Sequence, residues 1–146
     1  MRAVGDDLGG HGLKILIATD VFPPNCGGAG WSAYYLARAL RARGHGIAVV
    51  RPRFVAAITR PTLVRTAYDG LPVAELLLPG GGPALRRLWT RNIIAPRHLR
   101  RLIAAEARRL EADLIHAQHA LTVVASVREA AVGLRRSAVA SPHTLV

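Results

Sequence analysis

The chain has 146 residues, of which 51% are hydrophobic, and its formal net charge is +11 at pH 7. This hydrophobic content excludes an intrinsically disordered protein, and the apolar runs are far shorter than the roughly 20 residues that a membrane span requires. The length fits one domain with a single core. Because residues 1–12 are polar and glycine-rich, without an apolar signal segment, we expect a cytoplasmic protein in which residues 1–13 form a flexible amino-terminal segment.

Short apolar segments alternate with amphipathic segments along the chain. The sequence predicts strands over residues 14–19, 47–50, 72–78, 113–117 and 137–140, and helices over 32–43, 84–112 and 121–135. Pro96 is expected to separate two helices within the basic helical region. Residues 54–58 fit either a short strand or a loop, and Asp69-Gly70 indicates a turn. The alternation predicts an α/β fold, a parallel sheet with helices on both faces.

A glycine cluster lies between the first strand and the first helix. Gly27, Gly28 and Gly30 let the backbone approach a ligand without a Cβ, and the first N–H groups of a helix favour anions. Ligands bind beyond the carboxyl ends of parallel strands, where residues 116–119 and 141–144 form two further polar clusters. We therefore predict that the three clusters converge on a site for a phosphate or a sugar. Cys26, the single cysteine, excludes an intrachain disulfide and fits a small loop residue better than a reactive thiol.

A dinucleotide-binding domain is an alternative. Residues 28–33 fit the G-x-G-x-x-A form of the fingerprint, although Arg51 stands where the acidic residue that binds the ribose is expected. An arginine can accept the 2′-phosphate of NADP. A stand-alone Rossmann-like module that binds a nucleotide such as NADP, or a polyanion, is therefore a second hypothesis for the function.

Arginine dominates the positive charge and gathers in one region. Nineteen of the 20 basic residues are arginines, and eight of them lie between Arg86 and Arg109, where Leu85, Leu88, Trp89 and Ile93 share one helical face. Three interpretations stay open: a solvated helix face that covers the core, a surface that docks peripherally on anionic lipid at the inner membrane face, and a surface for nucleic acid. The sequence contains no motif for specific nucleic-acid recognition, so we expect no specific nucleic-acid partner.

Several segments resemble, in order and spacing, the amino-terminal domain of glycosyltransferase family 4, the retaining enzymes of the GT-B fold. They are Lys-Ile-Leu-Ile-Ala-Thr-Asp-Val-Phe-Pro-Pro-Asn-Cys-Gly-Gly-Ala-Gly (14–30), Leu36 to Leu40, Arg43-Gly44-His45, Tyr68 to Val73, Ala112 to His119 and the strand before His143. The resemblance implies a Rossmann-like domain over residues 14–146 that holds the acceptor, which is a sugar, a lipid or a small molecule. It also implies a carboxyl-terminal domain that binds a nucleotide-sugar donor. Because the paired glutamates of that domain have no counterpart here, we expect a fragment without the carboxyl-terminal donor domain, and an amino-terminal domain that ends early, on its fifth strand. We expect it to be an enzyme of hexosyl transfer only as part of the full-length protein.

The resemblance also assigns candidate site residues. It matches Gly27 and Gly28 to the loop whose backbone N–H groups meet the donor phosphates and the acceptor. It matches His143 to the histidine near the reaction centre, which donates a hydrogen bond to the transferred sugar or to a phosphate oxygen, while Thr144 stands where the family commonly has an acid. The other binding candidates are Gly30, His119 and Ser141, and for His119 a structural role stays equally open, whereas His116 fits a hydrogen-bonded strand residue better. We expect no metal and no cofactor, with the nucleotide sugar acting as substrate.

Overall fold

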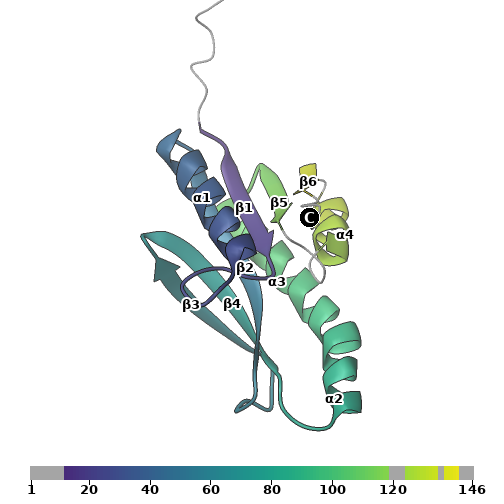
Figure 1. Cartoon of the computed structure of the whole chain (residues 1–146). Helices are drawn as coiled ribbons and strands as arrows, with labels where there is room; N and C mark the ends of the chain where they lie inside the picture. Colours follow the sequence, from purple (N-terminus) through teal and green to yellow (C-terminus); the bar gives the residue numbers. More distant parts are fainter. Residues whose placement is uncertain (1–11, 119–123, 135–136, 142–146) are drawn as a thin grey trace, which may run out of the picture.

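The computed structural model describes residues 12–118, 124–134 and 137–141. Its elements are β1 (Lys14–Thr19), α1 (Gly28–Ala42), β2 (Gly46–Val55), β3 (Thr62–Tyr68), β4 (Leu71–Pro79), α2 (Ala84–Trp89), the π-helical turn η1 (Thr90–Ile94), α3 (Ala95–Leu110), β5 (Leu114–Gln118), α4 (Val124–Leu134) and β6 (Ser137–Ser141). The six strands of the described residues form one sheet in the order β3-β4-β2-β1-β5-β6 (Figure 1). β3 pairs antiparallel with β4, and every other pair is parallel. The α/β, Rossmann-like fold expected from the sequence is confirmed.

The pleat of the sheet divides the apolar side chains between two cores. Successive side chains of a strand point to opposite faces, so Ile15 and Ile17 pack on the face that α1 covers, whereas Leu16 and Ala18 pack on the face that α3 and α4 cover (Figure 1). Both faces are therefore apolar, which explains the continuous apolar run in β1. Helices therefore cover both faces of the sheet, as predicted.

β2 runs five residues beyond the expected end at Val50. Pro52 lacks an N–H group and was expected to stop the strand. β1 pairs with residues 46–50 of β2, and beyond that point only β4 lies beside β2, with Pro52 opposite Leu76. Because β2 forms no hydrogen bonds with β1 at Pro52, the missing N–H group of the proline costs no hydrogen bond on that side. β3, which the sequence analysis missed, is an edge strand with exposed or half-buried side chains and hence no apolar alternation.

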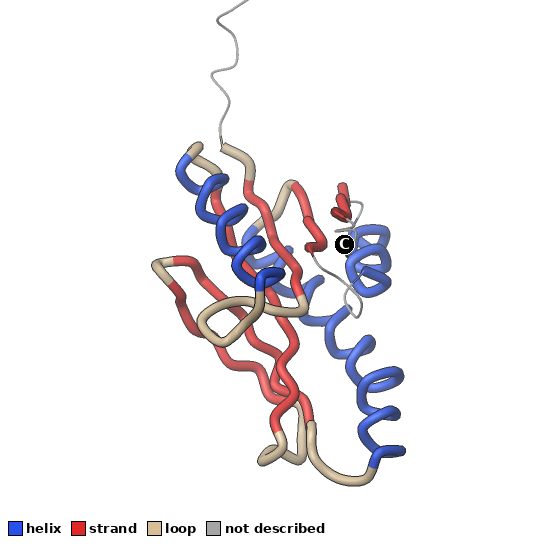
Figure 2. The backbone as a smooth tube through the Cα atoms, in the orientation of Figure 1, coloured by secondary structure: helices blue, strands red, loops and turns tan. Residues whose placement is uncertain are grey.

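The basic helical region forms one continuous helical run rather than two helices separated at Pro96. α2, η1 and α3 follow one another without a break, as the helical stretch in Figure 2 shows. A proline inside an α-helix removes one hydrogen bond and clashes with the carbonyl group four residues earlier. The π-helical turn at Thr90–Ile94 shifts the hydrogen-bonding pattern just before Pro96, which lies in the first turn of α3. No helix within the described ranges is long and apolar enough to cross a membrane.

The predicted turn at Asp69-Gly70 connects β3 to β4 and also holds α1. Asp69 and Gly70 have φ values of 50° and 72°, as a tight hairpin turn requires. The Tyr34 hydroxyl donates a hydrogen bond of 2.7 Å to the Asp69 carboxylate, and Arg41 donates one of 2.8 Å to the Asp69 carbonyl oxygen. The hydrogen bond to Asp69, together with burial, raises the pKa of Tyr34. This turn therefore fixes α1 against the β3–β4 hairpin.

Replacing Asp69 by alanine should lower the free energy of unfolding by about 1–3 kcal/mol, because the buried Tyr34 loses its acceptor and alanine fits a positive φ poorly. Asp69→Asn is the matched control, since asparagine accepts the same hydrogen bond and tolerates the left-handed region. Urea unfolding should place Asp69→Asn close to the parent chain. Equal losses in both variants would show that neither the hydrogen bond nor the turn conformation accounts for the effect.

Candidate functional site

The loop between β1 and α1 lies at the carboxyl edge of the sheet and carries the predicted glycines. α1 begins at Gly28, four residues earlier than expected, because Gly27 takes the N-cap position with an extended backbone (φ −82°, ψ −169°). No side chain caps the helix there. Because glycines are poor helix formers, the glycine cluster carries little sequence signal for the start of a helix. The N-terminus of α1 thus coincides with the glycine cluster.

A buried ion pair holds this loop in place. Arg51 and Glu75 lie opposite each other in the register of β2 and β4, and both side chains are only 11% exposed. Nη2 of Arg51 donates a 2.9 Å hydrogen bond to Oε1 of Glu75, and Nη1 donates one of 2.8 Å to the carbonyl oxygen of Phe22. The Phe22 ring is fully buried and packs edge-on against Tyr34 and Tyr68 at centroid distances of 6.2 and 6.1 Å. Both the backbone and the side chain of Phe22 are therefore anchored.

A hollow of about 870 Å³ opens beside the anchored loop. Three parts of the chain line it: the β1–α1 loop, the second half of β2 with Glu75 in the middle of β4, and the turn from η1 into α3. The lining residues are Asp20, Val21, Pro24, Asn25, Arg51, Pro52, Arg53, Phe54, Glu75, Arg91, Asn92 and Pro96. Arg53 also donates to Glu75 over 3.3 Å, and the Arg91 guanidinium lies 5.3 Å from the centre of the Phe54 ring. Three arginines, two carboxylates and an aromatic ring thus converge beyond the carboxyl end of β1, beside the second half of β2 and the middle of β4.

The three predicted glycines differ in their surroundings. A Cβ on Gly27 or Gly28 would meet no described atom within 4 Å, and both residues are exposed. A Cβ on the buried Gly30 would lie 2.4 Å from Sγ of Cys26 and 3.3 Å from the backbone nitrogen of Phe22. Gly30 is therefore required by packing inside the loop. For Gly27 and Gly28, neither packing within the described residues nor a positive φ requires glycine.

Cys26 belongs to the packing of this loop. Burial raises the pKa of its thiol, and the nearby Arg51 guanidinium offsets this only in part. A raised pKa keeps the thiol protonated near neutral pH, whereas a cysteine nucleophile requires the thiolate. The sequence-based preference for a small loop residue agrees with this.

The other predicted site residues lie at the ends of β5 and β6. Thr19, Gln118 and Ser141 occupy one level of the sheet, paired across β1, β5 and β6, so the backbone of Ser141 reaches the same edge as the glycine loop. His116 contacts the Gln118 side chain, with Nε2 2.8 Å from Oε1, as expected for a hydrogen-bonded strand residue. His119 and His143 lie outside the described residues. Within those residues no group of three or more His, Cys, Asp or Glu side chains could hold a metal ion.

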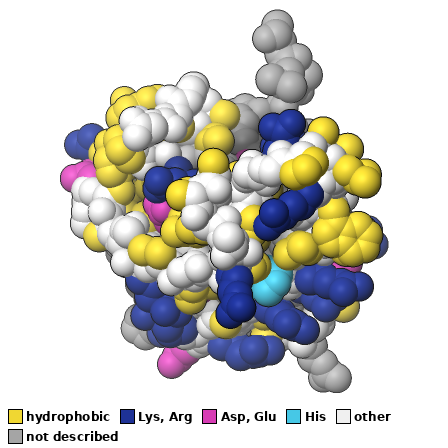
Figure 3. All heavy atoms as spheres, turned by 90° about the horizontal axis from the view of Figure 1, so that it is seen from below, with side chains coloured by type: hydrophobic (Ala, Val, Ile, Leu, Met, Phe, Trp, Pro, Cys, Tyr) yellow, Lys and Arg dark blue, Asp and Glu magenta, His cyan; other side chains and the backbone are white. Residues whose placement is uncertain are grey.

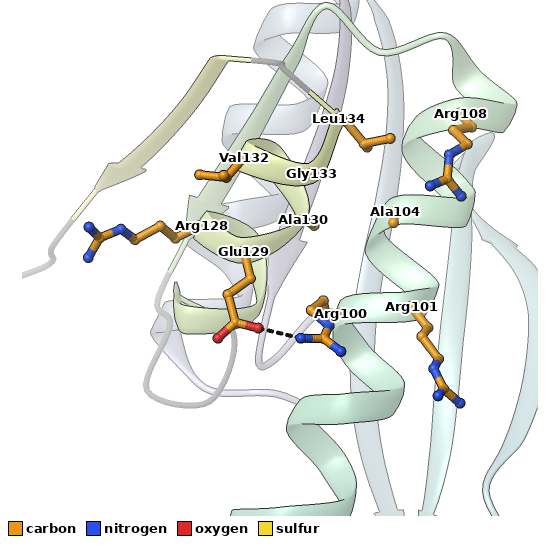
Figure 4. A pocket seen from close by; sticks show the side chains of 10 residues that line it. All are labelled: Arg100, Arg101, Ala104, Arg108, Arg128, Glu129, Ala130, Val132, Gly133 and Leu134. Atoms are coloured by element: carbon orange, nitrogen blue, oxygen red, sulfur yellow. Dashed lines mark hydrogen bonds and ion pairs between the residues drawn. The ribbon is translucent and has the colours of Figure 1, made fainter.

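A second, larger hollow of about 1090 Å³ lies between α3 and α4. Figure 4 shows its lining side chains, among them Arg100, Arg101, Arg108 and Arg128, with Arg100 paired to Glu129 over 2.9 Å. This hollow lies between α3 and α4, on the face of the sheet that these two helices cover, rather than at the carboxyl ends of the strands. Because ligands of such sheets bind beyond the strand ends, we assign the candidate site to the smaller hollow.

Sequence reasoning missed most of the residues that line the candidate site. Arg51 was considered as a ligand for a 2′-phosphate, but both of its terminal nitrogens already have protein partners. Glu75 stands alone in the apolar run Val73–Leu78, and a lone charge in a buried strand is a signal for a paired side chain. Arg91 and Asn92 lie in η1, far from the β1–α1 loop in the sequence, and no local pattern places them beside it.

Replacing Glu75 by leucine should lower the free energy of unfolding by about 3–5 kcal/mol, because Arg51 then keeps a buried charge without its carboxylate. The double variant Arg51→Met with Glu75→Leu should recover much of this loss in urea unfolding. The exposed pair of Lys14 and Glu111, 3.2 Å apart, offers a comparison, since Lys14→Met should cost less than about 1 kcal/mol. Equal losses for Glu75→Leu and Lys14→Met would contradict the anchoring role.

Alanine should destabilise the chain at Gly30 but not at Gly28. Gly30→Ala should lower the free energy of unfolding by about 1–3 kcal/mol, because its Cβ overlaps the Cys26 side chain. Gly28→Ala should leave it unchanged or raise it, since the added methyl group meets open space and alanine favours a helix. Thermal unfolding of the two variants measures the difference, and destabilisation by Gly28→Ala would mean that Gly28 serves packing.

Comparison with known proteins agrees with this geometry. The profile of the family described as Glycosyltransferase Family 4 matches residues 26–146. The match begins in the β1–α1 loop and takes in the glycine cluster, Arg51 and Glu75. No curated protein matches the sequence. Because the family profile covers well over half of the residues, the chain belongs to glycosyltransferase family 4.

Proposed function

We propose that this domain forms the acceptor side of the cleft in a retaining, GT-B glycosyltransferase, which moves a hexosyl group from a nucleotide-sugar donor to an acceptor. Membership of the family supports sugar transfer in general. The observation that carries the finer proposal is the pair of exposed glycines at the N-terminus of α1, beside a polar hollow at the same sheet edge. In this proposal a second domain binds the nucleotide.

The N-terminus of α1 suits the charge that develops during transfer. Retaining transfer builds positive charge on the anomeric carbon and negative charge on the departing diphosphate. The N–H groups of Gly28 and Ala29 belong to the first turn of α1, where the helix dipole presents its positive end. Such fixed donors stabilise developing negative charge more effectively than water, because they need no reorganisation. We assign this role to the glycine loop, with the site closed by the second domain.

The hollow offers groups that suit a hydroxylated acceptor. Asn25 and Asn92 contribute carboxamides, which donate and accept hydrogen bonds, and the Phe54 ring offers an apolar face. The Arg53 side chain is 55% exposed and adds a cationic donor. A few polar groups around an apolar surface are typical of small-molecule sites. His143 keeps its proposed role as a hydrogen-bond donor to the transferred sugar or to a phosphate oxygen.

The alternative of a stand-alone nucleotide-binding module receives less support. It relied on Arg51 as the partner of a 2′-phosphate. Arg51 is 91% buried, and its two terminal nitrogens hold Glu75 and the backbone of Phe22. If the two terminal nitrogens of Arg51 bound a phosphate, their hydrogen bonds to Glu75 and to the Phe22 carbonyl oxygen, which anchor the β1–α1 loop, would have to break.

Transfer assays with UDP-, GDP- and ADP-sugars test the proposal. The 146-residue chain alone should show no transfer, whereas a protein that joins this domain to a second α/β domain with paired glutamates should be active. In that active protein, Gly28→Val should abolish transfer with an unchanged melting temperature, because the side chain blocks close approach to the backbone.

Gly133→Val is the matched control for that experiment. Gly133 lies in α4, and a Cβ there also meets no described atom within 4 Å. The control should keep full activity. Full activity of Gly28→Val, or turnover by the chain alone, would contradict the proposal.

A further inference from the structure

The outer face of α2 and η1 exposes a group of large apolar side chains. Leu85, Leu88, Trp89 and Ile93 are 79, 56, 59 and 38% exposed. Their spacing of three, four and eight residues from Leu85 places them on one face of the helix. Thr90, between them in sequence, is 3% exposed and lies on the face toward the protein. We refer to these four apolar side chains, with Arg86 and Arg87, as the α2 surface.

The charge around this face has one sign. No Asp or Glu occurs between Glu75 and Glu106, whereas six arginines do. Arg86 and Arg87 are exposed, and neither forms an ion pair with a described carboxylate. Seen from the end of the molecule where α2 lies, Figure 3 shows arginine side chains gathered beside exposed hydrophobic side chains. Exposed leucines elsewhere are single, and single exposed apolar residues need no explanation, but a contiguous group indicates a contact.

We propose that the α2 surface docks on anionic lipid, with the four apolar side chains in the headgroup region and Arg86 and Arg87 against lipid phosphates. An amphipathic helix with apolar and aromatic residues flanked by arginines is typical of interfacial binding. A second copy of the chain fits poorly, because two such faces would bring their arginines together. Nucleic acid would contact the arginines but leave the exposed leucines unexplained.

The position of the α2 surface links it to the candidate site. Arg91 and Asn92, in η1, line the hollow at the carboxyl ends of the strands, and Arg91 rests on the Phe54 ring. A bilayer bound at the α2 surface would therefore lie next to the opening of that hollow. The proposal does not depend on the reaction, since docking is measured without donor or acceptor.

Vesicle binding of the 146-residue chain tests the proposal. The chain should sediment with phosphatidylcholine vesicles that contain phosphatidylglycerol, bind vesicles of phosphatidylcholine alone much more weakly, and dissociate as salt rises to about 1 M, where the Debye length is about 3 Å. Trp89 emission should shift to shorter wavelength on binding. In Trp89→Phe the shift should disappear while sedimentation persists.

Two double variants separate charge from apolar contact. Arg86→Gln with Arg87→Gln should weaken binding to the anionic vesicles by about 30-fold, since each arginine near such a surface contributes a factor of about five. Leu85→Gln with Leu88→Gln should weaken binding at least tenfold. The control is Arg43→Gln with Arg108→Gln, which removes the same charge after α1 and in the last turn of α3 and should bind like the parent chain. Circular dichroism checks that all variants keep the fold.

Several results would overturn the proposal. Equal binding of the parent chain to neutral and anionic vesicles, or binding to neither, would do so. Equal weakening by the control and by Arg86→Gln with Arg87→Gln would assign binding to the net charge of +11 rather than to the α2 surface. A shift from dimer to monomer in Leu85→Gln with Leu88→Gln, with vesicle binding unchanged, would identify a second copy as the occupant.

Discussion

The arrangement of the candidate site depends on one buried arginine. Arg51 lies on the same face of β2 as the buried Ile47 and Val49. Ile47 and Val49 pack in the core beneath α1, whereas Arg51 contacts the β1–α1 loop, which precedes that helix. Through Glu75 it joins β2 to β4, and through the carbonyl oxygen of Phe22 it joins both strands to that loop. Removing a guanidinium from water is costly unless it is paired and hydrogen-bonded. The ion pair therefore favours one position of the loop, and with it one position for the N-terminus of α1.

The two cores and the open edge follow from the same sheet. Because α1 covers one face and α3 and α4 the other, the carboxyl ends of the strands remain as the place where polar groups gather. There the β1–α1 loop, the second half of β2, Glu75 of β4 and η1 line one hollow, and the exposed Gly27 and Gly28 follow the lining residue Asn25 in the same loop. The continuous run from α2 to α3 connects this edge to the α2 surface. In our proposals one end of the molecule thus contributes to both sugar transfer and lipid docking.

The fold was largely predictable from the sequence, whereas the lining of the site was not. Short apolar runs and the turn at Asp69-Gly70 gave β1, β4 and β5 nearly to the residue. β3 was missed because an edge strand has little burial pattern, and the extension of β2 was missed because Pro52 is tolerated only where no neighbouring strand pairs with it. The role of Arg51 could not be inferred from local sequence, because Glu75 becomes its partner only through strand pairing. Predictions for His119 and His143 lie outside the described residues.

The central claim is that the exposed glycines at the N-terminus of α1 face a site for the phosphates of the donor. Amide chemical shifts of the chain, titrated with inorganic pyrophosphate, test it most directly because they report the location of binding as well as its strength. The account predicts that the largest changes fall on Gly27, Gly28 and Ala29. Changes confined to the arginine-lined hollow between α3 and α4, or spread evenly over the basic surface, would contradict it.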